Sequence, residues 1–195
     1  LMIILVGLGN PGEKYKNTRH NIGFEFIDSV HNYFHFPKFK SKFDGLYSRK
    51  HLFQNNVIIF KPQSFMNLSG NPIMKLRKFF GADNLSDLII IHDDFDVSFL
   101  NIKIKSKGGH GGHNGVKDTI KFNGEFFHRI KLGIRNSESL ENNMKAESFV
   151  LANFSKFEKE KITKMKESFS LNLKYLIEKN FSLFKKNVQE NYNGI

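Results

Sequence analysis

The order of apolar and polar positions along the chain predicts strands that alternate with helices. Short apolar runs bounded by glycine, proline or asparagine are typical of buried strands, and strict alternation is typical of a strand with one exposed face. Six segments with these patterns are expected to be strands: residues 2–6, 46–53, 57–61, 88–92, 101–105 and 127–134. Asn55-Asn56 is expected to form the turn between the second and third of them.

Apolar residues spaced three and four apart predict the first helices. Residues 21–34 carry one such stripe, and a second helix is expected to begin at Ser69 or Asn71 and to end at Gly81. A shorter helix is expected from Val116. These helices separate the predicted strands, which is the arrangement of an α/β sheet.

The C-terminal part of the chain is predicted to be helical throughout. Ser155-x-x-Glu158 has the form of a capping box, and a long apolar stripe follows it. Asn180 is expected to interrupt this region before a last amphipathic helix over about residues 182–191. The stripe consists of Ile162, Met165, Phe169, Leu173, Leu176 and Ile177.

These elements predict one α/β domain over residues 1–195, with a mixed, mostly parallel sheet flanked by helices and a helical part from about residue 155. The chain has no cysteine, which excludes disulfides and thiolate metal ligands. No apolar stretch approaches the roughly 20 residues of a membrane span. The net charge of +11 favours a polyanionic partner such as nucleic acid or an anionic membrane, although a solvated lysine-rich surface has the same charge.

The loop after the first predicted strand concentrates reactive side chains. It brings Asn10, Tyr15, Arg19 and His20 to one end of the sheet, where ligands bind in open α/β folds. Its glycines also match the G-x-G-x-x-G pattern of dinucleotide binding, which needs a helix N-terminus directly at the pyrophosphate. A proline and the polar residues 13–20 delay the helix, which disfavours a nucleotide cofactor.

His20 and Asp93 are predicted to activate water for hydrolysis. A neutral imidazole can accept a proton from water, and a carboxylate at its other nitrogen holds the tautomer and stabilises the imidazolium. The chain has no cysteine and no G-x-S-x-G elbow, which favours direct attack by water. Asn10, Asn67 and Asn114 lie in predicted loops, where an amide can orient water or polarise a carbonyl, although asparagine is also a common turn residue.

Histidines in and near a glycine-rich loop allow two interpretations. His110 and His113, with His92, Asp93 and Asp94, have the residue types of a zinc site. A ligand pair in a glycine loop lacks the rigidity of such a site, so we expect no metal. The favoured alternative is that the loop's backbone amides form a pocket for an anion or a carbonyl at a helix N-terminus.

Lysines on two neighbouring predicted strands form a candidate phosphate patch. Lys103, Lys105 and Lys107 share one face by strand alternation, and Lys131 and Arg135 come from the adjacent strand. Such a patch attracts RNA phosphates. The alternative is a solvated edge strand that its lysines protect from pairing.

Longer motifs connect these residues. They are G-N-P-G-x-x-Y-x-x-T-R-H-N-x-G over residues 9–23, K-P-x-x-F-M-N-x-S-G over 61–70 and G-H-G-G-H-N-G over 109–115. The segments H-D-D at 92–94 and F-H-R at 127–129 accompany them. Together, in this order along nearly the whole chain, they resemble bacterial peptidyl-tRNA hydrolases.

The resemblance implies a cytoplasmic, monomeric α/β enzyme that needs no metal or cofactor. Such enzymes hydrolyse the ester between a peptide, or an N-blocked amino acid, and tRNA. His20 would be the general base and Asp93 its partner, and Asn10 would help to distinguish peptidyl from free aminoacyl substrates.

The resemblance also implies the residues that bind the substrate. Those of the peptide and terminal-adenosine side would be Tyr15, Phe65, Met66, Asn67, His113 and Asn114. Asn67 and Asn114 would hold the substrate and the water. Lys105 and Lys131 match the positions that contact the tRNA 5′-phosphate, and Lys103 is expected to act with them.

Two segments depart from the family pattern on the expected tRNA side. Residues 133–137 read G-I-R-N-S where the family has Gly-Ile-Gly, a basic residue and proline, and S-F-L-N at 98–101 replaces a Pro-Gly turn. An RNA-binding protein that kept the fold and charge without catalysis is the alternative function. Such a protein is expected to have lost His20 or Asp93, and both are present.

Overall fold

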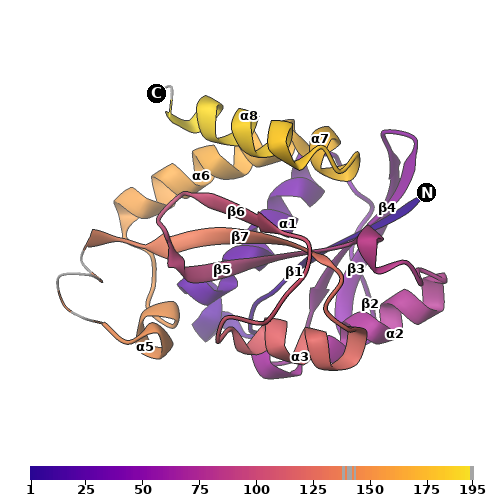
Figure 1. The fold of residues 1–195 in the computed structure, drawn as a ribbon, viewed down its shortest axis with the longest axis horizontal. Coiled ribbons are helices and arrows are strands. Elements are labelled where there is room, and N and C mark those ends of the chain that lie inside the picture. The colour runs from indigo at the N-terminus through magenta and orange to yellow at the C-terminus, as the bar shows by residue number, and fades with distance from the viewer. Residues whose placement is uncertain (138, 140–141, 143, 194–195) are drawn as a thin grey trace.

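The apolar runs of the sequence form the centre of one sheet. In a computed structural model, which describes residues 1–137, 139, 142 and 144–193, the strand order is β2-β3-β4-β1-β5-β7-β6 (Figure 1). The four central strands β4, β1, β5 and β7 run parallel, and the two edges are antiparallel. The strands are β1 (Met2–Gly7), β2 (Lys40–Lys42), β3 (Gly45–Leu52), β4 (Asn55–Pro62), β5 (Leu88–Ser98), β6 (Ile102–Lys105) and β7 (His128–Arg135). The expected mixed α/β sheet is confirmed.

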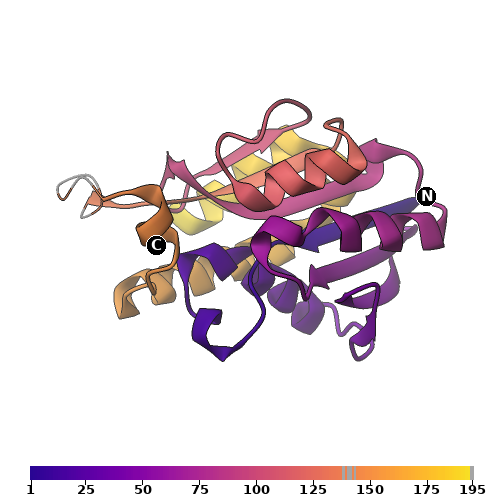
Figure 2. The ribbon, with the colours of Figure 1, turned by 90° about the horizontal axis from the view of Figure 1, so that it is seen from below.

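Helices cover both faces of the sheet, as Figures 1 and 2 show. On one face lie α1 (Ile22–Tyr33), α6 (Lys156–Leu171), α7 (Leu173–Ile177) and α8 (Phe181–Asn193). The other face carries α2 (Gly70–Phe80) and α3 (Asn114–Asn123). The short helix α5 (Ala146–Val150) lies beside the ends of the parallel strands. Among the described residues, no helix has the length and apolar character needed to cross a bilayer.

Each face of the sheet has its own apolar layer. On the α1 side, Phe169 of α6 packs edge-on against Phe26 at 5.0 Å and against Phe184 at 5.1 Å. All three rings are fully buried, and the predicted stripe of α6 and α7 is buried with them. Removing such a ring costs about 3–5 kcal/mol in other cores, so this contact holds the C-terminal helices on the sheet.

The β3–β4 turn differs from the expected one. Asn55 already pairs with Leu52 in the ladder, so the turn consists of Phe53 and Gln54. Both have positive φ angles, 48° and 59°, the backbone form of a tight hairpin. The prediction was wrong because asparagine usually occupies such positions and phenylalanine seldom does.

The start of α2 also differs in detail. Ser69 occupies the N-cap position, but its hydroxyl donates to the Met66 carbonyl at 2.8 Å and makes no cap. The Gly70 N–H donates instead to an Asp118 carboxylate oxygen of α3 at 2.7 Å. The cap is therefore supplied across the α2–α3 contact, where no local sequence signal points to it.

Other boundaries shifted because of tertiary pairing. Strand β5 runs on through Asp93 and Asp94 to Ser98, since β7 continues to pair with it. The C-terminal helical region breaks at Asn172 as well as before α8, while the Ser155–Glu158 capping box is confirmed. Strand β2 and helix α5, each no longer than five residues, had no recognisable pattern.

Candidate active site

The site lies where β5 extends beyond the end of its neighbour β1. Gly7 at the end of β1 pairs with Ile91, whereas β5 continues and places Asp93 opposite Leu132 of β7. The chain leaving β1 turns back into α1 in close contact, since a Cβ on Gly7 would lie 2.2 Å from the Gly23 carbonyl oxygen. The loop between them is thereby positioned beside the exposed end of β5.

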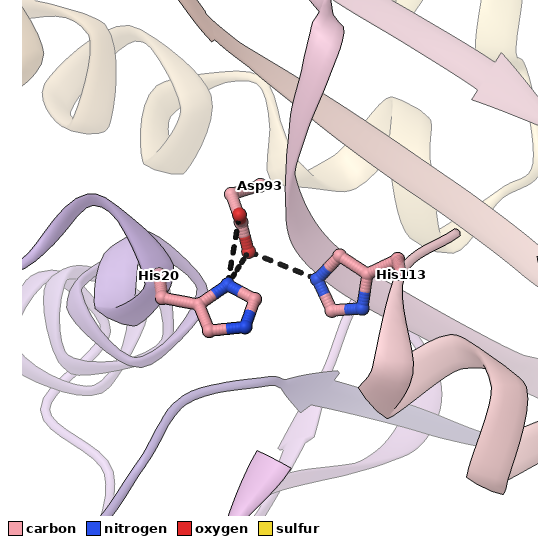
Figure 3. Close-up of side chains that lie close together, drawn as sticks. All are labelled: His20, Asp93 and His113. Atoms are coloured by element: carbon pink, nitrogen blue, oxygen red, sulfur yellow. Dashed lines mark hydrogen bonds and ion pairs between the residues drawn. The ribbon is translucent and has the colours of Figure 1, made fainter. Parts of the chain in front are cut away.

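His20 projects from this loop onto Asp93. Its Nδ1 lies 2.8 Å from both carboxylate oxygens, as Figure 3 shows. An imidazole nitrogen at that distance from an ionised carboxylate carries the proton and donates it. The Nε2 atom is then the basic nitrogen, and it has no protein partner among the residues that the structure describes.

The charges of the cluster stabilise one another. Burial lowers the pKa of His20, but the charge of Asp93 and its hydrogen bond raise it, and the pKa ends above its usual value. Burial acts to raise the pKa of Asp93, yet electrostatic attraction to the His20 and His113 rings and the hydrogen bonds from them hold that pKa well below the usual range. Asp93 is therefore ionised at any pH at which His20 titrates.

His113 binds Asp93 from the other side (Figure 3). Its Nε2 lies 2.9 Å from Asp93 Oδ1, while its Nδ1 accepts the N–H groups of Gly115 and Val116 at 3.1 and 3.3 Å. The imidazole is thus the N-cap of α3. Because Nδ1 accepts, Nε2 must carry the proton, so His113 donates to the carboxylate as a neutral ring.

Metal-ligating atoms of His20, Asp93 and His113 lie within 4.8 Å of one another. A metal on His113 would need an unprotonated Nε2, which the two amide donors at Nδ1 oppose. His110 stays outside the cluster; it is exposed, and its Nδ1 accepts from Gly112 N at 3.0 Å. The residue chemistry therefore fits a hydrogen-bonded cluster better than a metal site, and the absence of a metal stays a prediction.

His92 is buried beneath the cluster. Its Nδ1 lies 2.6 Å from the Asp93 carbonyl oxygen, and its ring packs against that of His113 at 4.6 Å. Burial and the nearby His113 and Lys131 hold the pKa of His92 well below its usual value. His92 is therefore a neutral packing partner of His113.

A cavity of about 240 Å³ lies over the cluster. The described residues that line it include His20, Asp93, His113 and Asn114, with Ala146 and Val150 of α5 as an apolar wall. Sequence reasoning missed that wall, because α5 lies far along the chain and its pattern is too short to recognise. The cavity is large enough for a small ester group and a water molecule.

Asn10 lies outside the His20 cavity and is held by three hydrogen bonds. Its backbone N–H donates to Asn21 Oδ1 at 2.8 Å, its carbonyl accepts from Asn21 Nδ2 at 2.9 Å, and its Oδ1 accepts from Met66 N at 2.7 Å. Its Nδ2 has no partner in the described part of the chain. Asn10 lines a separate groove of about 600 Å³, outside the cavity that holds His20.

The other residues expected to bind the substrate differ in burial and in their contacts. Tyr15 and Phe65 make an edge contact at 6.4 Å, and Phe65 is 53% exposed. Met66 is buried, whereas Asn67 is exposed on the short turn Met66–Leu68. The structure thus groups Asn10 with Met66, and Tyr15 with Phe65, without placing them in the His20 cavity.

Arg19, directly before His20, is anchored on the C-terminal part. Its Nη2 lies 2.9 Å from Glu158 Oε2 and 3.1 Å from Oε1, and both side chains are buried. Its Nη1 donates to the Asn153 carbonyl, and its guanidinium lies 4.2 Å from the centre of the Phe149 ring. From the sequence, Glu158 was identified only as part of a capping box. The one indication of a further role was Arg19, a cation directly before His20 that would need a counter-ion if buried.

The lysine patch is partly neutralised. Lys103 pairs with Lys131 across β6 and β7, so the two side chains share a face, as expected. Lys131 Nζ lies 2.5 Å from Asp94 Oδ2, whereas Lys103 and Lys105 are exposed without a carboxylate partner in the described residues. Arg129 is directed inward and donates to the carbonyls of Gly108 and Gly109, which anchors the glycine loop.

Comparisons with known proteins agree in one family. A sequence model of the peptidyl-tRNA hydrolase family matches residues 4–194. The peptidyl-tRNA hydrolase of Fusobacterium nucleatum is 49% identical over 68% of this chain and 70% of its own, and that of Clostridium botulinum is 41% identical over 82% and 81%. The crystal structure of the Acinetobacter baumannii peptidyl-tRNA hydrolase superposes with a TM-score of 0.85 at 29% identity, covering 96% of this chain and 94% of the other.

Proposed function

The chain belongs to the peptidyl-tRNA hydrolase family, and on this premise we propose that it releases tRNA from peptidyl-tRNA through His20. It is a hydrolase by that membership. The observation that carries the assignment of His20 is its bond to both Asp93 oxygens at 2.8 Å, which leaves Nε2 at the cavity without a partner among the described residues. An unpaired basic nitrogen beside a cavity is the requirement for a general base.

In the proposed reaction, His20 Nε2 takes a proton from a water molecule as its oxygen attacks the ester carbonyl carbon. The carbonyl π bond opens to a tetrahedral oxyanion, and Asp93 stabilises the imidazolium that forms. The oxyanion then collapses, the bond to the ribose 3′-oxygen breaks, and the imidazolium returns its proton to that oxygen. The products are free tRNA and a peptide with a free carboxyl group.

We propose different tasks for the surrounding residues. Asn114 lines the cavity and is exposed, so its amide is available to orient the water. Asn10 Nδ2, which has no partner in the part of the chain that the structure describes, is assigned to a peptide carbonyl, and the exposed Asn67 is assigned to the same substrate. Both ring nitrogens of His113 are engaged, so we assign it to positioning Asp93 instead of to direct substrate contact.

Lys103 and Lys105 are proposed to contact the tRNA phosphates. Both ammonium groups are exposed on the β6 edge, which suits a salt-dependent contact with a polyanion. Lys131 lies on the same face as Lys103, but its charge is paired with Asp94, so we assign it no direct phosphate contact. The monomeric state, the cytoplasmic location and the independence from metals that the resemblance implies stay predictions.

The test is release of an N-blocked amino acid from tRNA, measured for the wild-type chain and for His20→Ala, with and without EDTA. We expect the substitution to lower kcat by about 10²–10⁴-fold, the usual effect of removing a general base. Circular dichroism and tRNA binding should stay unchanged, and EDTA should have no effect on the wild type. Retention of more than about a tenth of the activity would contradict the role of His20.

A further inference from the structure

A second group of positive charges lies at the sheet edge opposite β6. Residues 36–50 and 74–81 contain eight lysines and arginines and one acid, Asp44. Asp44 is already paired with Lys75 at 2.6 Å. These two segments therefore carry a net charge of +7, on and beside β2, β3 and α2, which lie on the right in Figure 1.

The strand register gathers several of these side chains on one face. Lys40 lies opposite Tyr47, and Lys42 lies opposite Gly45, in the β2–β3 pair. Residues opposite each other or two apart in a hairpin project to the same side, so Lys40, Lys42, Tyr47 and Arg49 do so. The end of α2 covers this side, because the Phe80 ring lies 5.7 Å from Tyr47 and 5.9 Å from the Arg49 guanidinium.

Between the hairpin and α2 lies a hollow of about 330 Å³, which we call the basic–aromatic hollow. Phe79 at its rim is 58% exposed, and the Lys42 ammonium lies 3.8 Å from the centre of its ring. Within the described residues, the cations at the hollow have no carboxylate partner. Its lining includes Lys38, Lys40, Tyr47, Arg49, Phe79 and Phe80.

We propose that the basic–aromatic hollow binds single-stranded RNA. Unpaired cations along a strand attract the phosphates, and an exposed ring offers a stacking surface to any unpaired base. Lys40, Lys42 and Arg49 hold the backbone, and Phe79 stacks on a base. Duplex RNA presents phosphates but keeps its bases inside the helix, and an anionic bilayer has no planar group to fill a hollow lined by rings.

This surface is separate from the proposed tRNA contact. Strands β2 and β6 are the two edges of a seven-stranded sheet. At about 4.8 Å between strands, six intervals separate Lys40 from Lys105 by about 29 Å. The proposal is therefore independent of the function assigned to His20 and the β6 lysines.

The test measures fluorescence anisotropy of the full chain with a labelled oligouridylate of about 12 nucleotides, within the usual range of single-strand sites. We expect Lys40→Glu/Arg49→Glu to abolish binding at about 0.15 M salt, where phosphate contacts dominate. Phe79→Ala should weaken binding about tenfold while leaving the salt dependence unchanged. The matched control, Lys156→Glu/Lys164→Glu, makes the same charge change at exposed sites on α6 and should bind as the wild type does.

Further measurements test whether the variants are folded and whether the hollow prefers single-stranded RNA to duplex RNA or a lipid surface. Hydrolysis of an N-blocked aminoacyl ester on a CCA trinucleotide should be equal in all four proteins, which shows that each variant is folded. Equal loss of RNA binding in both double variants, or tighter binding to a duplex of the same length, would overturn the proposal. The proposal would also be overturned if the chain bound phosphatidylserine vesicles through Lys40 and Arg49 and did not bind RNA.

Discussion

Asp93 holds the site together at the scale of single residues. It accepts hydrogen bonds from two imidazoles, of which one is the proposed base and the other is the N-cap of α3. One carboxylate thus fixes the tautomer of His20 and ties the glycine loop to β5. Because Asp93 stays ionised, it also raises the pKa of His20.

We expect Asp93→Asn to act mainly on kcat. An amide can donate to His20 Nδ1 and so favour the tautomer with its proton on Nε2, which cannot accept a proton from water. Loss of the anion should also lower the pKa of His20. The neutral base then persists to lower pH, and the acidic limb of the pH–rate profile moves to lower pH. An acidic limb at the wild-type position would contradict the pairing.

The sequence identified most of this cluster but not its internal bonding. Asp93 directly follows one apolar run, and His20 lies in the loop after another, so both were expected at the carboxyl ends of neighbouring strands. His113 was expected at the substrate, because nothing in the sequence indicates that its Nδ1 caps α3 while its Nε2 reaches Asp93. Bonds between segments 20 and 73 residues apart depend on the packed sheet.

At the scale of elements, the loop that carries His20 depends on a helix near the other end of the chain. Arg19 and Glu158 form a buried pair, and Asn136 at the end of β7 donates to the same carboxylate at 2.8 Å. Glu158 Oε2 also accepts from Ser155 N at 2.7 Å in the capping box. The start of α6, the end of β7 and the proposed base are therefore joined through one side chain.

We expect Glu158→Gln to destabilise the fold and to lower kcat, with a smaller change in KM. It leaves the Arg19 charge buried without a counter-ion, which typically costs about 3–5 kcal/mol. The amide retains an acceptor, so the lower end of that range is expected. Urea unfolding measures the stability, and NMR titration of His20 reports whether its contact with Asp93 has loosened, which would lower its pKa.

The matched control is Glu25→Gln, which breaks the ion pair between α1 and Lys166 of the same helix α6. That pair is partly exposed, so its loss should cost less than about 1 kcal/mol and leave kcat unchanged. Equal effects of the two substitutions on kcat and on the His20 titration would show that Glu158 is only a stabilising residue of α6.

The pattern of apolar positions predicted the long elements well. Burial against a parallel sheet requires an apolar run in each strand and an apolar stripe on each helix, and both are visible in the sequence. Strands β1 and β7 and helices α1 and α6 began within one or two residues of their expected positions. The misses were features whose cause is tertiary: the extension of β5 by β7, the cap of α2 by Asp118, and the short wall helix α5.

At the scale of the whole molecule, charge is distributed over separate surfaces. The parallel core directs the loops of the site to one end of the sheet, and the two sheet edges carry different sets of cations. Net charge alone predicted a polyanionic partner but not these locations. Nor did it show that Lys131, expected at the tRNA, is paired with Asp94.

We therefore expect Lys103→Ala/Lys105→Ala to raise KM for peptidyl-tRNA with little change in kcat, since phosphate contacts position the substrate far from the bond that breaks. Each lost contact should reduce the slope of log(kcat/KM) against log[salt] by about one. A CCA-linked substrate without the tRNA body should be hydrolysed as by the wild type. Lys164→Ala, an exposed lysine on α6, is the control and should keep the wild-type slope. If the double variant keeps both the wild-type KM and the wild-type slope, β6 is a solvated edge, and the tRNA body is bound by another surface.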